Sequence, residues 1–184
     1  MRITVSPGKS HQEFQGLGCG AMFFEGHVTS LAVRQKNDRQ RELYDDMFAK
    51  VNTRYPTRKG GEALINVDWG SDYFLKKTYW VFRQWSTPLE AGMRVVESSS
   101  SGNMIRVASF YSAGRKLVVH VTNSTDAAIP VQLAIAGANV APPGRQRTSA
   151  TENAASLAPL PASPAGFADT LPARSFTTFQ FLVK

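Results

Sequence analysis

From Met93 to the C-terminus the sequence repeats one pattern, in which short runs rich in β-branched and aromatic residues alternate with clusters of turn-forming residues. The runs are MRVVES, MIRVASFYS, KLVVHVTN and IPVQLAIAG, and they are interrupted by SSSSGN, AGR and STDAA. Serial short strands at this spacing are typical of a β-sandwich. The two middle runs are so close together that they predict a β-hairpin, with its turn at SAGRK.

The closing segment SFTTFQFLV predicts one more strand of the same sandwich. Its side chains Phe176, Phe179 and Phe181 cannot all face one side of a regular strand, because successive side chains alternate between the two faces. A bulge, or burial on both faces, is therefore expected. At the other end of the chain, RITV at residues 2–5 alternates polar and apolar positions, which predicts a short strand that ends in a turn at SPG.

The segment between these strands has a different character. In residues 38–51 apolar side chains recur at the i, i+4, i+8 spacing of an amphipathic helix. The segment PTRKGGE, residues 56–62, is polar and glycine-bearing and predicts a loop, and ALINVDWG after it predicts a buried strand. In residues 76–86 three aromatic side chains share one helical face, which favours a second helix.

Composition fits an ordinary globular protein of 184 residues, with one domain or one domain and an appendage. The formal net charge is +7, but the basic residues are scattered and do not alternate with aromatic ones, so nucleic acid is not favoured as a partner, whereas an acidic polysaccharide fits the charge. Cys19 is the only cysteine, which excludes an internal disulfide and a thiolate metal cluster. The chain contains no apolar run long enough to cross a membrane and no N-terminal signal core, so no membrane partner is expected.

Both ends of the chain resemble glycoside hydrolase family 30. The segment VSPGKSHQEFQGLGCG is similar to the family's entry into a barrel, with Gln12, Gly16 and Gly18 at the positions of its Gln-x-x-x-Gly-x-Gly motif. The segment YWVFRQWSTPLEAGMRV resembles the family's helix, turn and first sandwich strand, with Ala91-Gly92 where Pro-Gly is usual. RTSATENAASLAPL and LPARSFTTFQF resemble its closing strands. The resemblance covers roughly residues 1–55 and 65–184.

This resemblance implies a (β/α)₈ barrel joined to a β-sandwich that is built from both chain ends. A complete barrel takes about 250 residues, whereas only about 40 separate the first predicted helix from the sandwich here. Most of the barrel is therefore expected to be missing, with the cut edges joined near residues 55–62. We expect a mainly β fold: a sandwich of about eight or nine strands with one or two packed helices. The expected division is 1–10 as its first strand, 11–92 as barrel remnant and 93–184 as the sandwich.

Retaining glycosidases need two carboxyl groups about 5–5.5 Å apart. In the family these follow the fourth and seventh barrel strands, which have no counterpart here, so no catalytic glutamate can be carried over. Glu25 and Asp68 follow barrel-type strands and are the candidates for a rebuilt pair, although solvated or salt-bridged carboxylates are the favoured interpretation. No metal site and no cofactor are expected, because His11, His27 and His120 show no ligand spacing with other residues.

Glycan binding is the favoured function, because sugar rings stack on exposed aromatic side chains. Trp69 and Tyr73, which follow a predicted strand, are the candidate carbohydrate-binding residues, while Trp80 and Trp85 are interpreted as core anchors. The first hypothesis is a non-catalytic, carbohydrate-associated β-sandwich. The alternative is a glycoside hydrolase that acts on β-linked xylan or glucan, and a third is a deletion product of structural interest only. The resemblance implies an extracellular or periplasmic location, and the surface left by the missing barrel predicts homo-oligomerisation.

Overall fold

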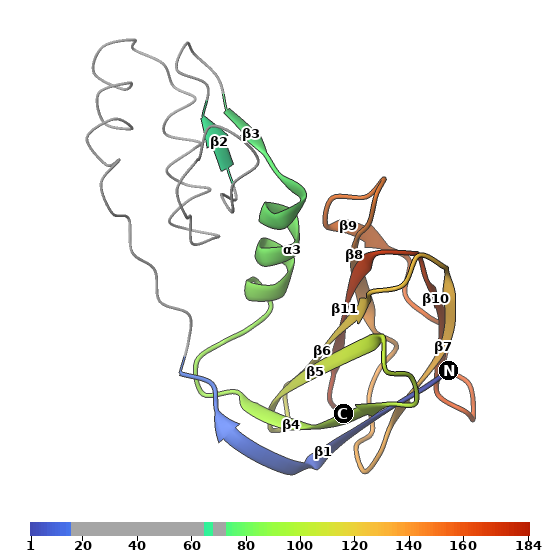
Figure 1. Cartoon of the computed structure of the whole chain (residues 1–184). Coiled ribbons are helices and arrows are strands. Elements are labelled where there is room, and N and C mark those ends of the chain that lie inside the picture. Colours follow the sequence, from blue (N-terminus) through green and yellow to red (C-terminus); the bar gives the residue numbers. More distant parts are fainter. Residues whose placement is uncertain (16–64, 68–72) are drawn as a thin grey trace. The chain divides into compact units, whose positions relative to one another are not determined.

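The computed structural model describes residues 1–15, 65–67 and 73–184 (Figure 1). The chain divides into two compact units, one made of Met1–Gly16 and Pro88–Lys184 and the other of Leu17–Thr87. The helix predicted over 38–51 and the junction near 55–62 lie outside the described residues. The assignment of 11–92 to barrel remnants stays a prediction.

The first unit contains a nine-stranded sheet in the order β10-β7-β1-β4-β5-β6-β11-β8-β9. This confirms the mainly β fold class and the predicted number of strands. β1 comes from the N-terminus and lies between β7 and β4, beside strands that follow it by about ninety residues or more (Figure 1). The strands are β1 Arg2–Glu13, β4 Arg94–Ser100, β5 Ile105–Ser112, β6 Lys116–Asn123, β7 Ile129–Ile135, β8 Gly144–Thr148, β9 Ala155–Leu157, β10 Phe167–Leu171 and β11 Ser175–Leu182.

Two layers arise because β4 and β5 are paired over only part of their length. Arg94–Val96 pairs with 109–111, and beyond Val96 β4 continues to pair with β1 while β5 continues to pair with β6. The sheet therefore divides into β10-β7-β1-β4 and β5-β6-β11-β8-β9, which share the short β4–β5 corner. This curled, two-layered arrangement encloses the core.

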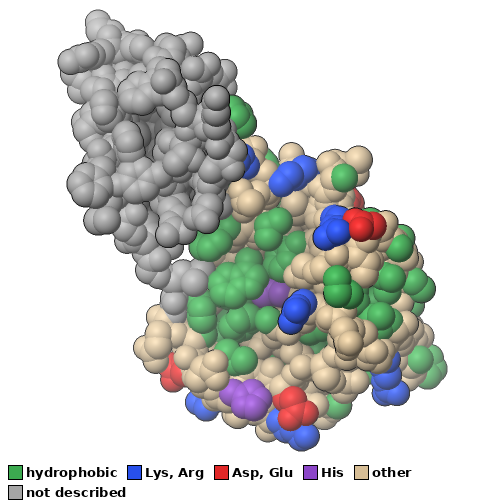
Figure 2. All heavy atoms as spheres, in the orientation of Figure 1, with side chains coloured by type: hydrophobic (Ala, Val, Ile, Leu, Met, Phe, Trp, Pro, Cys, Tyr) green, Lys and Arg blue, Asp and Glu red, His purple; other side chains and the backbone are tan. Residues whose placement is uncertain are grey.

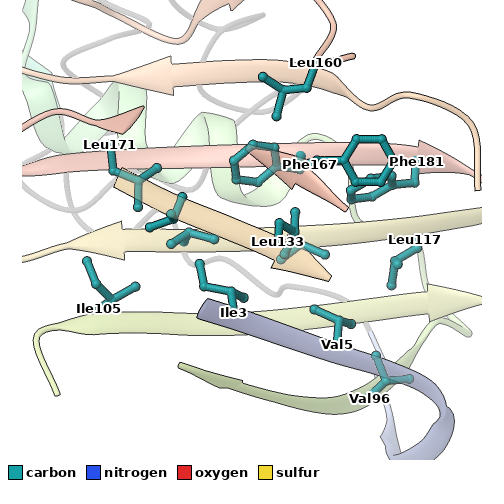
Figure 3. Close-up of a cluster of buried hydrophobic side chains, with 14 residues drawn as sticks. Ile3, Val5, Val96, Ile105, Leu117, Leu133, Leu160, Phe167, Leu171 and Phe181 are labelled. Carbon is teal, nitrogen blue, oxygen red and sulfur yellow. The ribbon is translucent and has the colours of Figure 1, made fainter. Parts of the chain in front are cut away.

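The core is one cluster of buried aliphatic and aromatic side chains from both layers (Figure 3). Phe167 of β10 contacts Phe181 of β11, with ring centroids 5.3 Å apart, and so joins the two layers. Burial of a large apolar side chain stabilises the fold by about 1.5–3 kcal/mol. The cluster consists of Ile3, Val5, Val96, Ile105, Leu117, Val119, Val121, Val131, Leu133, Leu160, Phe167, Leu171, Phe179 and Phe181.

The predicted hairpin is confirmed. β5 and β6 pair without interruption from Ile105↔Asn123 to Ser112↔Lys116. The connection contains Gly114 with φ +67°, a left-handed conformation that glycine adopts without steric cost. The turn residues in the sequence were sufficient to predict this element because both its strands and its loop are local.

The three phenylalanines of β11 were expected to require either a bulge or burial on both faces of the strand. Its register with β6 is continuous from Ser175 to Leu182, so the strand has no bulge there and is buried on both faces. Phe179 and Phe181 belong to the core cluster, while Phe176 lies on the other face, stacked on His120 with ring centroids 5.4 Å apart. Two-sided burial explains why the strand is so rich in apolar residues.

The turn predicted at SPG is wrong. Ser6–Gly8 lies within β1, where Ser6 pairs with Glu97 but the next pair joins Ser10 to Val96. β1 therefore carries extra residues as a bulge. Pro7 has no N–H to donate to a ladder, and a bulge accommodates such a residue without ending the strand.

Candidate functional site

The predicted carbohydrate site lies on the second unit, around a two-stranded antiparallel sheet. β2 Ile65–Val67 pairs with β3 Tyr73–Leu75, and Val67 lies opposite Tyr73. The strand predicted in ALINVDWG is thus present. The five residues that connect the two strands, 68–72, include Asp68 and Trp69 and lie outside the described residues, as does Glu25.

Tyr73 begins β3, which places its backbone opposite Val67, but its side chain lies outside the described part of the structure. The next residue, Phe74, is 57% exposed. The exposure of Phe74 was not predicted, since an aromatic residue in a strand pattern ordinarily indicates core.

The predicted helix over 76–86 is confirmed as α3 Lys77–Ser86, which follows β3 directly. Within α3 the Arg83 guanidinium lies over the Trp80 ring, 5.4 Å from its centroid. Tyr79 contacts the same ring edge to face at 5.1 Å. These neighbours cover part of the Trp80 ring, so Trp80 is less suited than an uncovered aromatic to stack on a sugar.

Five carboxylates of the sheet unit form ion pairs with basic side chains. Two of them have resolved shifts: the Lys116 ammonium lowers the pKa of Glu90 by hydrogen bonding and charge, and Arg174 lowers the pKa of Asp126 in the same way. A glycosidase general acid needs a raised pKa, which is the opposite direction. The carboxylates in ion pairs are Glu90, Glu97, Asp126, Glu152 and Asp169.

Two of the three histidines, His11 and His120, lie in the described residues and could in principle bind a metal. His11 is exposed, and its backbone carbonyl accepts a hydrogen bond from Arg94 Nη2 at 2.5 Å. His120 is buried, with Nδ1 3.0 Å from Thr178 Oγ1 and its ring between Phe110 and Phe176. In the described ranges no three His, Cys, Asp or Glu side chains are grouped as a metal site would need. His27 lies outside these ranges.

The basic side chains on the visible face of the sheet unit are dispersed and do not form one patch (Figure 2). Several basic side chains of the sheet unit are neutralised locally, as in the ion pair of Arg174 Nε with Asp126 Oδ1 at 2.7 Å. A nucleic-acid site would instead gather unpaired cations along one surface. Among the described residues, no helix has the length and apolar character needed to cross a bilayer.

No family model matches this sequence. Solved structures are similar in fold. A GH30 endoxylanase from Clostridium papyrosolvens C71 aligns with a TM-score of 0.58 and 17% identity, covering 93% of this chain and 40% of the xylanase. A glycoside hydrolase family 30 subfamily 8 xylanase from Clostridium acetobutylicum aligns with a TM-score of 0.59 and 21% identity, covering 95% of this chain and 41% of the other.

A third similar structure is the catalytic domain of a GH30 xylanase from Talaromyces cellulolyticus, with a TM-score of 0.52 and 21% identity. This alignment covers 66% of this chain and 27% of the Talaromyces domain. This chain thus spans about 40% of the first two xylanases, which agrees with the expected loss of most of a barrel. In fold, the chain is a shortened counterpart of family 30 glycoside hydrolases.

Proposed function

We propose that this chain is a non-catalytic, carbohydrate-associated β-sandwich of glycosidase fold, which binds a polysaccharide or oligosaccharide through Trp69 and Tyr73. The observation that supports the proposal most is the alignment: nearly all of this chain matches GH30 xylanases, yet it spans only about 40% of their length. A chain that keeps the flanks of such an enzyme retains surfaces that lie beside a glycan, while the segments that supply the reactive acids are lost.

The proposal also draws on the ion pairing of the sheet unit. Carboxylates such as Glu90 and Asp126 have lowered pKa values, so they stay ionised and do not donate protons near neutral pH. Binding without turnover requires only an accessible aromatic surface and hydrogen-bonding groups. In sequence, Trp69 belongs to the β2–β3 connection and Tyr73 begins β3, and the proposal assigns both aromatic residues to one glycan site.

Retention on insoluble xylan and insoluble β-glucan tests this function. We expect the chain to sediment with at least one of the two, and Trp69→Ala or Tyr73→Ala to raise the apparent Kd about tenfold, as loss of a stacking contact worth about 1.4 kcal/mol would. Phe74→Ala is the matched control, because Phe74 is an exposed aromatic of the same small sheet that the proposal does not assign to the site, so this variant should bind like the parent. Equal retention of all variants, or none by the parent, would refute the proposal.

A turnover assay distinguishes the proposed binding function from the alternative, which is hydrolysis through Glu25 and Asp68. Purified protein should release no chromogenic leaving group from β-xylosides or β-glucosides under the proposal. Release that falls at least about 100-fold in both Glu25→Gln and Asp68→Asn would instead establish the rebuilt pair. Because GH30 xylanases are the similar structures, xylosides are the first substrates to test.

Two further properties belong to the same proposal. A carbohydrate partner of this kind favours an extracellular or periplasmic location, and one similar structure is described as a conserved exported protein from Bacteroides fragilis. We also propose self-association, because a sandwich that has lost its barrel must cover the surface that faced it, and a second copy can do so. Light scattering after size-exclusion chromatography should give a mass above that of the 20.2 kDa monomer.

A further inference from the structure

The nine-stranded sheet ends in β10 on one side and in β9 on the other. Within the described residues β10 pairs with β7 alone and β9 pairs with β8 alone. The sheet nevertheless curls so that side chains of β8 reach β10. Two arginines make this connection in place of a backbone ladder.

Arg145 and Arg147 are alternate residues of β8, so their side chains leave the same face of the strand. Their partners on β11 are Phe179 and Thr177, and Phe179 belongs to the core cluster. Directly opposed residues in a ladder place their side chains on one face of the sheet. Both arginines therefore point to the inner face, where an unpaired charge would be costly.

Each arginine donates one hydrogen bond or bond pair near β9 and another to β10. Arg145 Nε donates to Ala158 O at 2.9 Å, just after β9, and its Nη1 donates to Asp169 Oδ1 of β10 at 2.8 Å. Arg147 Nε donates to both carboxylate oxygens of Glu152, at 3.1 and 3.0 Å, in the β8–β9 connection. Its Nη1 donates to the backbone carbonyl of Thr170 on β10 at 3.1 Å.

These side chains are largely removed from water. The exposed fractions are 12% for Arg145 and 8% for Asp169, and 14% for Arg147 and 22% for Glu152. Solvent screens such pairs much less than surface pairs, and removing one partner leaves an uncompensated buried charge. The hydrogen bond to Thr170 O also occupies a carbonyl on an edge strand, a group that would otherwise be open to pairing with another chain.

We propose that Arg145 and Arg147 form a side-chain seam that closes the curled sheet, and that β10 with the preceding segment 159–166 opens at this seam as a unit while the rest of the sheet stays folded. β10 is only five residues long and has backbone pairing on one side. β6, by contrast, is paired along its whole length with β5 and with β11. Local opening follows the elements with the fewest such restraints.

Hydrogen exchange of the full chain, followed by mass spectrometry, tests the seam. In Arg145→Met and in Asp169→Asn we expect peptides covering Phe167–Leu171 to exchange at least about tenfold faster, and peptides covering Leu117–Val121 to change by less than about threefold. The control is Arg174→Met, which removes an ion pair that is 65% and 83% exposed and should leave β10 protection unchanged. Unchanged β10 exchange in the seam variants, or an equal increase in every strand, would overturn the proposal.

Two other variants keep the test decisive if a single replacement prevents folding. Arg145→Met combined with Asp169→Leu removes the link without leaving an unpaired charge, so β10 should exchange more slowly than in Arg145→Met but still faster than in the parent. Arg147→Lys keeps the charge beside Glu152 but loses the fork that reaches Thr170 O, so β10 should again exchange faster. Parental exchange of β10 in the double variant, or parental exchange in Arg147→Lys, would contradict a seam.

Discussion

Thr177 lies on the inner face of β11 with no exposed surface, and its hydroxyl has no hydrogen-bond partner within the described residues. Thr177→Val replaces this hydroxyl with a methyl group of similar shape. We expect the free energy of unfolding to rise by about 1 kcal/mol, because a buried polar group without a partner costs that much or more. Urea denaturation measures the change, and Thr178→Val, which removes a hydroxyl bonded to His120, should shift it the other way.

Asn123 shows the reverse situation, in which one buried side chain satisfies several backbone groups. Its Nδ2 donates to Ala127 O at 2.8 Å and Pro172 O at 2.7 Å, and its Oδ1 accepts from Thr125 N at 3.0 Å. Asn123→Ala leaves these groups without their partner, so we expect a loss of about 2–3 kcal/mol in the free energy of unfolding. Thermal unfolding monitored by circular dichroism is the measurement, and a loss below about 0.5 kcal/mol would contradict this role.

At the scale of elements, the alignment of β10 on β7 depends on Gly166. Its φ is +106°, and a Cβ there would lie 2.2 Å from the carbonyl oxygen of Leu133 in β7. Gly166→Ala must therefore shift the strand as well as adopt a strained backbone, and should cost more than about 2 kcal/mol. Gly92 also has a positive φ, +88°, but open space around it, so Gly92→Ala should cost only about 1 kcal/mol in the same urea titration.

The connection that leads into β4 is tied to the start of β6 by Glu90, which accepts a hydrogen bond from Lys116 Nζ at 2.6 Å. This bond and the Lys116 charge lower the pKa of Glu90 from its usual value. A carboxyl with a lowered folded-state pKa stabilises above its unfolded pKa and loses that contribution as the pH falls through the folded value. Glu90→Gln should therefore have a slightly lower Tm than the parent at neutral pH, and the difference should shrink and vanish as the pH falls through the lowered folded-state pKa of Glu90. A constant difference across that range would exclude this linkage.

Strand positions could be predicted because alternation and turn residues are local signals. KLVVHVTN coincides with β6, and Gly114 marks its turn. The bulge of β1 and the separation of β4 from β5 could not be predicted in this way, since both depend on which distant strands pair. The same limit applies to the seam: Arg145 and Asp169 are 24 residues apart, and neither lies in a motif. Of the predicted carbohydrate-binding residues, the structure describes the backbone of Tyr73, and the role of Tyr73 in binding stays a prediction.

For the whole molecule, the central consequence is that the sheet needs both ends of the chain. β1 pairs with β7 on one side and β4 on the other, and Ile3 and Val5 are fully buried in the core. The layer β10-β7-β1-β4 thus depends on a segment that pairs with strands about eighty residues or more away in the sequence, a contact of high sequence separation. Without β1, the inner edges of β4 and β7 lose their ladder and part of the core is open.

A chain that lacks residues 1–13 should therefore lose cooperative unfolding and near-ultraviolet circular dichroism, since fixed packing is lost while some strand content remains. A peptide of residues 1–15 added in trans should restore both signals in a saturable manner, because an extended segment can complete an open sheet through main-chain hydrogen bonds. The same peptide with Ile3→Asp and Val5→Asp keeps the backbone but places charges in the core, so it should not restore them. Cooperative unfolding of the truncated chain at the parental Tm would show that the two layers hold together without β1, through the β4–β5 corner and the arginine seam.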